Sequence, residues 1–144
     1  MVQPGAFNII PNRAIVTAEC RHFRTALMNE MEMAILSIAR ECAASYGLDV
    51  SINTTAHMPA AAMSVSITHA ILQACEQLHH SHMHLISYAG HDAQILGQVT
   101  PAGLIFIPSV GGVGHDPGEY TRWEHVVNGA NVLLHTILNL AASA

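Results

Sequence analysis

The chain has 144 residues, of which 51% are apolar, and a net charge of −5 with no lysine. A chain of this length and apolar content can bury a core, which excludes an intrinsically disordered protein. The acidic balance and the lack of a basic run with interleaved aromatic residues argue against a nucleic-acid partner. Only 10% of the residues are charged, against about a quarter in ordinary soluble domains. We therefore expect another subunit, or a further part of the same protein, to cover much of the surface.

The cysteines and the hydropathy pattern predict a cytoplasmic protein. Cys20, Cys42 and Cys75 are odd in number and show no CxxC spacing, which is typical of reduced thiols. The first residues lack the basic and apolar regions of a secretory signal. No apolar stretch reaches the ~20 residues of a membrane helix, so we expect no membrane association.

The first elements along the chain are a predicted hairpin and a long helix. Two β-rich runs, Ala6–Ile10 and Arg13–Glu19, flank Pro11-Asn12, a pair that favours a tight turn. Apolar residues then recur at three- and four-residue steps from about residue 23 to residue 46. Gly47 is expected to end this helix.

The remaining elements indicate an α/β protein. Asp49–Thr55 alternates as a strand, and a boundary follows near residue 58. Beyond it strands and helices alternate, which implies parallel pairing with right-handed crossovers. Two strands do not make a stable parallel sheet, so the sheet is expected to be incomplete within this chain. The expected elements are a helix over Ser64–Leu78, a strand over Met83–Ser87, a short helix over Asp92–Val99, a strand over Leu104–Pro108 and a helix over Arg122–Ala142.

Two glycine-rich loops, each following a predicted strand, carry the candidate functional histidines. His91 lies in Ala89–Ala93 and His115 in Gly111–Tyr120. Strand-end loops collect catalytic groups, and a histidine beside acidic residues can ligate a metal or donate a proton. His115 is the strongest metal-ligand candidate, although one histidine cannot hold a catalytic ion. His91 could stabilise a developing oxyanion, while Asp92 is as well suited to capping the next helix.

Three other features leave alternatives open. The tract His79, His80, His82 and His84 could bind metal, but a solvated turn is the favoured interpretation. Asn8 and Arg21 lie on the two arms of the predicted hairpin and could meet an anion on one face. A lone arginine on a strand is usually only solvated, so their pattern alone assigns them no role. The apolar stripe of the first helix, which includes Met28, Met31 and Met33, predicts core packing or a subunit contact.

Five motifs occur in an order that resembles a known family. They are Asn8–Pro11, Thr17–Arg21, Ala89–Ala93, Phe106–Ser109 and Gly111–Glu119. Together they are similar to the C-terminal part of the M20-type amidohydrolases of the hydantoinase/carbamoylase group, which includes N-carbamoyl-L-amino-acid hydrolases, β-ureidopropionases and allantoate amidohydrolases. The resemblance covers essentially the whole chain and is specific for the family rather than for a substrate.

The resemblance implies a domain organisation and an activity. Residues 1–58 would be the second half of a ferredoxin-like lid, or dimerisation, domain. Residues 59–144 would be the end of a di-metal, aminopeptidase-like catalytic domain. The implied activity is metal-dependent hydrolysis of non-peptide C–N bonds in N-carbamoyl amino acids or in ureides such as allantoate. A homodimer would form through the lid domain, with the methionine-rich helix at the interface.

The resemblance also implies roles for individual residues. His115 matches the last metal-ligand histidine, and His91, after Gly90, matches the histidine that contacts the scissile amide or carbamoyl group. Asn8 and Arg21 match the lid residues that bind the substrate carboxylate. The intact enzyme would hold two divalent ions, zinc or manganese, with cobalt or nickel as possible replacements. This chain would supply one of their ligands.

Departures from the family pattern limit these expectations. Gly114 stands where the family usually has serine, Tyr88 where it has glycine, and Glu19-Cys20 where it has aspartate and an aliphatic residue. The family's other metal ligands and its general-base glutamate have no counterpart in these residues. We therefore expect the chain alone to be inactive. It could be a catalytically dead remnant that serves as a dimerisation module, or one half of a split enzyme that needs an N-terminal half.

Overall fold

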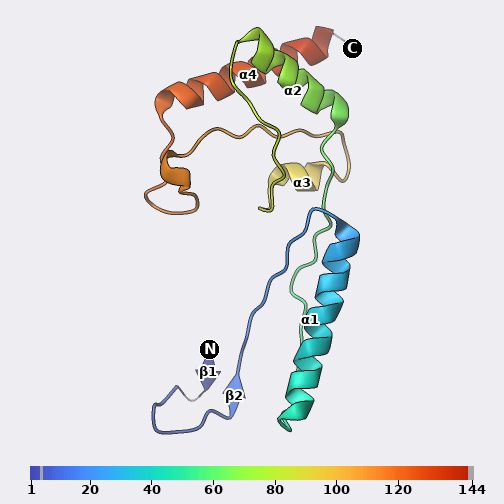
Figure 1. Ribbon diagram of the computed structural model, residues 1–144, viewed down its shortest axis with the longest axis vertical. Helices are drawn as coiled ribbons and strands as arrows, with labels where there is room; N and C mark the ends of the chain where they lie inside the picture. The colour runs from blue at the N-terminus through green and yellow to red at the C-terminus, as the bar shows by residue number, and fades with distance from the viewer. Residues whose placement is uncertain (4, 143–144) are drawn as a thin grey trace. The chain divides into compact units, whose positions relative to one another are not determined.

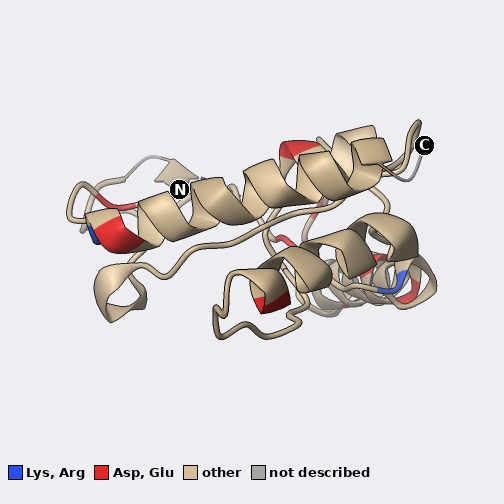
Figure 2. Cartoon of the chain, turned by 90° about the horizontal axis from the view of Figure 1, so that it is seen from above, with Lys and Arg blue, Asp and Glu red and all other residues tan. Residues whose placement is uncertain are grey.

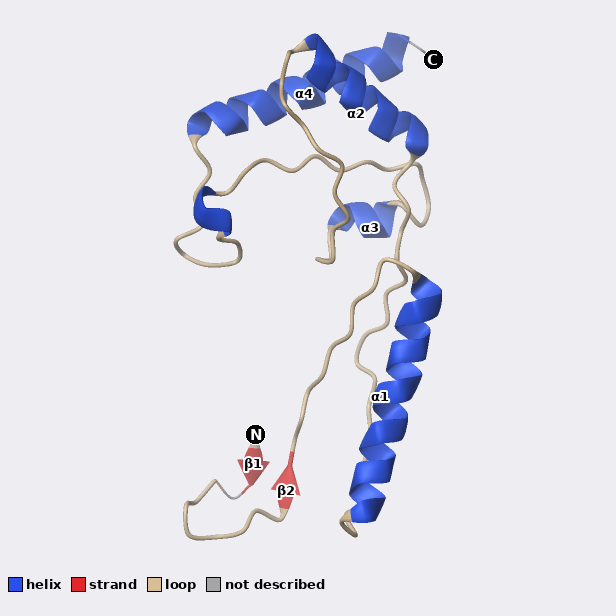
Figure 3. Cartoon of the chain, viewed as in Figure 1, coloured by secondary structure: helices blue, strands red, loops and turns tan. Residues whose placement is uncertain are grey.

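A computed structural model describes residues 1–3 and 5–142 of the chain. The chain forms two compact units, Met1–Met58 and Pro59–Ala144, which are described separately. Both units contain helices joined by long irregular segments, and the only strands among the described residues form one two-stranded sheet (Figure 3). The assignment of these units to a lid domain and a catalytic domain stays a prediction. None of the described helices combines the length and apolar character needed to cross a bilayer.

The first unit opens with a short antiparallel pair. Strand β1 (Val2–Gln3) pairs with β2 (Arg13–Ala14), with Val2 opposite Ala14 and Gln3 opposite Arg13. The terminal amine of Met1 extends the ladder by donating to the carbonyl of Ile15 at 2.9 Å.

The predicted hairpin is wrong in its first arm. Residues 6–10 form a turn and loop, and β2 ends at Ala14 rather than at Glu19. The register is set by residues 1–3, because the N–H of Asn12 donates to the carbonyl of Gln3 at 3.1 Å. Pro11-Asn12 therefore lies at the end of a long loop instead of forming a two-residue turn.

Helix α1 (Thr25–Ser45) confirms the predicted helix and its end. Gly47 adopts a left-handed backbone conformation with φ +63°. Its N–H donates to the carbonyl of Ala44, and the N–H of Leu48 donates to the carbonyl of Ala43. This pattern is a Schellman motif, in which glycine supplies the positive φ that closes the helix.

Residues 49–58 follow α1 without forming the predicted strand. Glu32 of α1 contacts this segment with both carboxylate oxygens. One accepts a hydrogen bond from Thr54 Oγ1 at 3.3 Å, and the other lies 3.0 Å from His57 Nδ1. Polar side-chain contacts, rather than a β-ladder, therefore hold this segment to the helix.

The second unit is built on the packing of helix α2 (Val65–Gln77) against helix α4 (Trp123–Ala142), which confirms these two predicted helices (Figure 1). Ala74 is completely buried, and together with Cys75 and Val132 it forms the core. Ile71, Leu78 and Ile105 surround this core. The buried hydroxyl of Thr136 donates to the carbonyl of Val132 at 2.7 Å, which satisfies its hydrogen-bonding need inside the helix.

The predicted strands at Met83–Ser87 and Leu104–Pro108 are wrong for this structure. Both segments lack helical turns, but neither has a ladder partner among the described residues. A β-strand needs hydrogen bonds to a neighbouring strand. Without such a neighbour these segments stay irregular, although their sequences resemble those of strands. Two shorter helical elements complete the unit, α3 (Asp92–Leu96), three residues shorter than predicted, and the single 3₁₀ turn η1 (Val110–Gly112).

Two glycines let the segment around residues 103–107 lie close to both long helices. A Cβ atom on Gly103 would come within 2.5 Å of Ile67 Cγ2 in α2. A Cβ atom on Gly129 of α4 would come within 2.5 Å of Ile107 Cγ2. Both distances are far below van der Waals contact, so the absence of side chains at these positions permits the packing.

The contact at Gly129 predicts an unusual effect of alanine. In an ordinary helix, replacing glycine by alanine stabilises by about 1 kcal/mol. Here we expect Gly129→Ala to lower the free energy of unfolding by about 1–3 kcal/mol, because the new methyl group overlaps Ile107. Denaturant unfolding of the 144-residue chain measures the effect.

The matched control repeats the change in an Ile107→Ala background. With the obstructing methyl group removed, Gly129→Ala should become neutral or stabilising. Equal destabilisation in both backgrounds would contradict the contact.

Candidate functional site

His91 is held by two contacts from different segments. Its Nε2 lies 2.9 Å from Ser87 Oγ, and its ring stands edge-on to Phe106 with the ring centroids 5.1 Å apart. The carbonyl of His91 accepts the N–H of Gln94 at the start of α3. The side chain is half-buried. A histidine oriented in this way by a hydroxyl and an aromatic ring can present its other nitrogen to a ligand.

The partner of the His91 ring is Ser87, which sequence reasoning did not identify. The neighbouring acid, Asp92, is the first residue of α3, and the ring nitrogen Nε2 contacts the Ser87 hydroxyl. The predicted capping role of Asp92 is wrong, because His91 occupies the N-cap position. The sequence feature that could have indicated this contact is the position of Ser87, which ends the apolar run Met83–Ser87 and lies four residues before His91.

Gly90 leaves open space beside His91. A Cβ atom at this position would meet only Gln94 Oε1, at an ordinary 3.8 Å. Packing within the described chain therefore does not require glycine here. Gln94 itself is fixed, since its amide nitrogen donates to the carbonyl of Pro59 at 2.8 Å. The arrangement allows a ligand to approach the backbone of the loop.

His115 lies in a tight, exposed loop and has an unusual backbone conformation. Its φ is +58°, in the left-handed region that favours glycine. The loop maintains this conformation because the N–H of His115 donates to Glu119 Oε2 at 2.8 Å. Asp116 accepts the N–H of Gly118 on its carboxylate and the N–H of Glu119 on its carbonyl. Backbone strain of this kind persists where surrounding contacts fix it and is concentrated at functional sites.

The described residues do not assemble a metal centre around His115. No group of three or more histidine, cysteine, aspartate or glutamate side chains is placed to hold an ion within residues 1–3 and 5–142. A catalytic zinc takes three protein ligands. This part of the chain therefore does not by itself fit a catalytic metal centre.

Asn8 and Arg21 lie outside the two strands. Asn8 is in the exposed turn between β1 and β2, and Arg21 follows β2. The expectation that they sit on paired arms of a hairpin is therefore wrong. Arg21 Nε donates to Glu19 Oε1 at 2.6 Å. This hydrogen bond and the charge of the guanidinium lower the pKa of the Glu19 carboxyl and raise that of Arg21.

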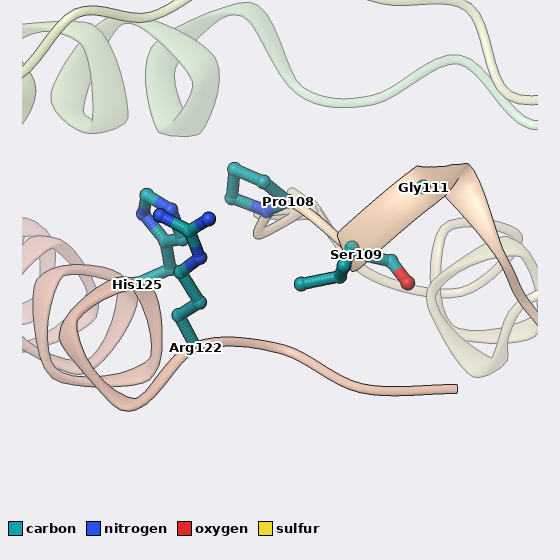
Figure 4. Close-up of a pocket in the computed structure, with 6 residues that line it drawn as sticks. Pro108, Ser109, Gly111, Arg122 and His125 are labelled. Atoms are coloured by element: carbon teal, nitrogen blue, oxygen red, sulfur yellow. The ribbon is translucent and has the colours of Figure 1, made fainter. Parts of the chain in front are cut away.

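The start of α4 borders a small cavity that sequence reasoning missed. It has a volume of about 210 Å³ and is lined by residues 108–111, Arg122 and His125. Figure 4 shows the Arg122 and His125 side chains beside each other, with Pro108 across the space. Glu124 Oε1 lies 3.9 Å from Arg122 Nη1 and 3.8 Å from His125 Nε2. This carboxylate offsets the positive charge at the rim, so the cavity is not a clear anion site.

Comparisons with known proteins cover nearly the whole chain. Residues 3–139 match peptidase family M20/M25/M40. The chain is 31% identical over 138 residues to an N-carbamoyl-L-amino-acid amidohydrolase of Rhizobium meliloti, covering 96% of this chain and 33% of that protein. It is 26% identical over 139 residues to an allantoate amidohydrolase of Escherichia coli (strain K12), covering 96% and 34%.

The comparison with solved structures leads to the same group of proteins. A hydantoinase/carbamoylase-family amidase from Burkholderia vietnamiensis superimposes with a TM-score of 0.82 at 29% identity, covering 96% of this chain and 34% of that one. The chain thus spans about a third of the length of the relatives it matches.

The pairing of Arg21 with Glu19 predicts that the pKa of Glu19 depends on Arg21. In Arg21→Gln the pKa of Glu19 should rise toward its ordinary value, because the hydrogen bond and the nearby positive charge are both lost. NMR titration of the glutamate carboxyl carbons measures it. Since folding depresses this pKa, the pair favours the folded state above the ordinary glutamate pKa, and its contribution is lost as the pH falls through the lowered value.

Arg24→Gln is the matched control. The Arg24 guanidinium lies over the Phe23 ring, 5.6 Å from its centroid. Its loss should leave the titration of Glu19 unchanged. A Glu19 pKa insensitive to Arg21→Gln would refute the pairing.

Proposed function

The chain belongs to peptidase family M20/M25/M40, and from that premise we propose that it is the C-terminal portion of a metal-dependent amidohydrolase. The proposed reaction is hydrolysis of a non-peptide C–N bond in N-carbamoyl amino acids or in ureides such as allantoate. For an N-carbamoyl amino acid, water would release the amino acid, ammonia and carbon dioxide. The observation that carries the proposal is the match over residues 3–139, which includes both histidine loops, with relatives named as amidohydrolases for such compounds.

His91 is the proposed catalytic residue of this chain. Its ring is positioned by Ser87 and Phe106, and Gly90 leaves room for a substrate to approach. A hydrogen bond from the imidazole to the attacked carbonyl oxygen would stabilise the negative charge that develops there. Such a donor acts most strongly when it is already oriented before the reaction, as the two contacts to this ring provide.

Arg21 and Asn8 are the proposed binding residues for the substrate carboxylate. A guanidinium can hold a carboxylate with two parallel hydrogen bonds, and the Asn8 amide can add another. The hydrogen bond that Arg21 donates to Glu19 supports this role, because the guanidinium already pairs with a carboxylate. A bound substrate would take the place of Glu19.

His115 is the proposed metal ligand, and the intact enzyme would hold two divalent ions, zinc or manganese, or else cobalt or nickel. Because the described residues do not fit a complete metal centre, the other ligands are proposed to belong to the part of the family's length that this chain does not span. The strained backbone at His115, fixed by Glu119, supports a functional role for this position.

Residues 1–58 are proposed as the second half of a lid domain that forms a homodimer. Their long helix, α1, keeps an apolar surface accessible, with Met33 and Ile38 each more than half exposed. Apolar surface of this kind on a helix is typical of a contact with another chain. The three cysteines are free, which agrees with the proposed cytoplasmic location.

Two alternatives follow from the short span of the chain relative to its relatives. It could be a catalytically inactive remnant that acts as a dimerisation module, or one half of a split enzyme. The exposed apolar surface supports both, because each requires association with another chain. Activity after mixing with a complementary segment separates them.

The first functional test is complementation. The 144-residue chain is assayed for ammonia release from N-carbamoyl amino acids and allantoate, with manganese or zinc, alone and with the separately expressed remaining segment of the Rhizobium meliloti relative. We expect turnover only in the mixture, because His115 supplies a single ligand. No turnover in either sample would favour the dimerisation module, and turnover by the chain alone would refute the proposed ligand distribution.

Within the active mixture, His115→Ala should abolish turnover. His69→Ala is the matched control, since His69 is an exposed histidine in α2 with no proposed role. It should leave turnover intact. Unchanged turnover in His115→Ala would remove His115 from the metal site.

A second test separates carboxylate binding from catalysis. In the complemented enzyme, Arg21→Lys should raise KM for N-carbamoyl amino acids by about tenfold or more, because lysine cannot form the two parallel hydrogen bonds. The value of kcat should change less. The corresponding N-carbamoyl amino-acid amide, which lacks the carboxylate, should show little change, and an equal rise in KM for both substrates would contradict the role.

A further inference from the structure

The hydroxyl of Ser87 makes three contacts, which together locate its hydrogen. Its Oγ accepts the N–H of Ala89 at 3.2 Å. The same oxygen lies 2.9 Å from His91 Nε2 and 3.4 Å from the carbonyl oxygen of Ala89. A hydroxyl has one hydrogen to donate and two lone pairs that accept. Because the Ala89 N–H occupies one lone pair, the hydrogen goes to one of the other two neighbours.

The distances favour the imidazole as the acceptor. A hydrogen bond from a hydroxyl to an oxygen spans about 2.5–3.0 Å, and the Ala89 carbonyl lies beyond this range at 3.4 Å. His91 Nε2, at 2.9 Å, is within normal reach. A ring nitrogen that accepts a hydrogen bond carries no hydrogen itself, so the hydrogen of a neutral His91 ring is on Nδ1.

The loop holds both partners of this contact in place. The hydrogen bond from the Ala89 N–H to Ser87 Oγ joins a residue to the second one after it, as in an ST-turn, so the hydroxyl is part of the backbone turn before His91. The His91 ring also stands edge-on to Phe106, with the centroids 5.1 Å apart. Turning the ring over would place a carbon against Ser87 Oγ and lose the hydrogen bond.

The other ring nitrogen is left available to a ligand. Within residues 1–3 and 5–142, His91 Nδ1 has no hydrogen-bond or ion-pair partner. We propose that the Ser87 hydroxyl holds His91 in the tautomer with hydrogen on Nδ1, and that Nδ1 is the atom that donates to the attacked carbonyl oxygen of a substrate. The second half of this inference rests on the proposed function. The first half concerns the chain by itself.

The tautomer decides what the ring offers to a carbonyl oxygen. With hydrogen on Nδ1, the ring donates to the oxygen and stabilises the negative charge that develops there. With hydrogen on Nε2, the lone pair of Nδ1 would face the oxygen and repel it. Ser87 does not touch the substrate in this arrangement. It is a positioning residue that acts through His91.

NMR of the 144-residue chain can locate the hydrogen directly. Long-range correlation between ring protons and ring nitrogens distinguishes a nitrogen that carries a hydrogen from one that does not. The spectra are recorded at about pH 8.5, above the ordinary histidine pKa of about 6.5, so that neutral rings are observed. We expect the hydrogen of His91 on Nδ1. A hydrogen on Nε2 would overturn the inference.

Three variants test whether Ser87 is the cause. Ser87→Ala should move the His91 hydrogen toward Nε2, because this nitrogen then has no hydroxyl from which to accept. Ser87→Thr keeps a hydroxyl and should keep the hydrogen on Nδ1. The matched control, Ser66→Ala, removes a hydroxyl of α2 that lies 2.9 Å from Ser64 Oγ, and should leave His91 unchanged. Identical His91 spectra for Ser87→Ala and the original chain would overturn the role of Ser87.

Turnover of the complemented enzyme gives a second readout. Ser87→Ala should lower kcat by about tenfold or more and change KM less, because the donor is lost where charge develops in the transition state. Ser87→Thr should retain most of the turnover, and equal losses in both variants would contradict the positioning role. A mixture that releases no ammonia would refute the proposed function and with it the role of Nδ1. The position of the hydrogen is decided separately, on the chain alone.

Discussion

The structure of the second unit depends on close packing between α2 and α4 through small residues. Ala74 is completely buried beside Val132, and no other pair of described helices within this unit is in contact. Gly103 and Gly129 allow the segment 103–107 to lie against both helices. That segment carries Phe106, whose ring contacts His91. The orientation of the candidate catalytic histidine is therefore linked to a helix–helix contact whose core residues lie far from it in sequence.

The outer surfaces of the helices are less typical of a complete globular protein. Leu133, Leu134, Ile137 and Leu138 of α4 are each more than half exposed. Figure 2 shows helices that are largely free of charged residues, and α4 carries one carboxylate, Glu124, in its first turn. Burial of apolar area contributes about 25 cal/mol per Å², so this surface leaves stabilisation unrealised. The segments 83–87 and 104–108 also lack ladder partners within residues 1–3 and 5–142. Both observations support the proposal that further polypeptide associates with the chain.

The sequence was sufficient for the features that depend on near neighbours. The apolar spacing in α1, α2 and α4 is local, and so is the Gly47 stop, which needs only the last turn of its helix. The strands failed because pairing depends on distant residues. β2 is paired by residues 1–3 instead of 6–10, and the segments 83–87 and 104–108 lack ladder partners in the described chain.

In the candidate site, too, the sequence was sufficient for local features but not for side-chain contacts. The two glycine loops were recognisable from sequence, but the contacts that orient their histidines were not. Ser87 reaches His91 across a loop with no regular period, and the Glu119 carboxylate binds the backbone of His115 rather than its ring. The pairing of Arg21 with Glu19 was also missed, because a spacing of two residues does not by itself show whether the side chains meet. Spacing in sequence identifies candidate chemistry, whereas side-chain orientation depends on the folded loop.

The Glu19–Arg21 pair also changes how an anion would bind to this arginine. A guanidinium that already holds a carboxylate exchanges one counter-ion for another, so no new net charge is neutralised. Because salt screens the departing and arriving carboxylates alike, the equilibrium should vary little with ionic strength. Discrimination among anions then rests on shape. Glu19 contacts the guanidinium through Nε, so an incoming anion competes best if it can form two parallel hydrogen bonds with the guanidinium. If Arg21 binds the substrate carboxylate as proposed, this internal competitor would make the site selective for geometry rather than for charge.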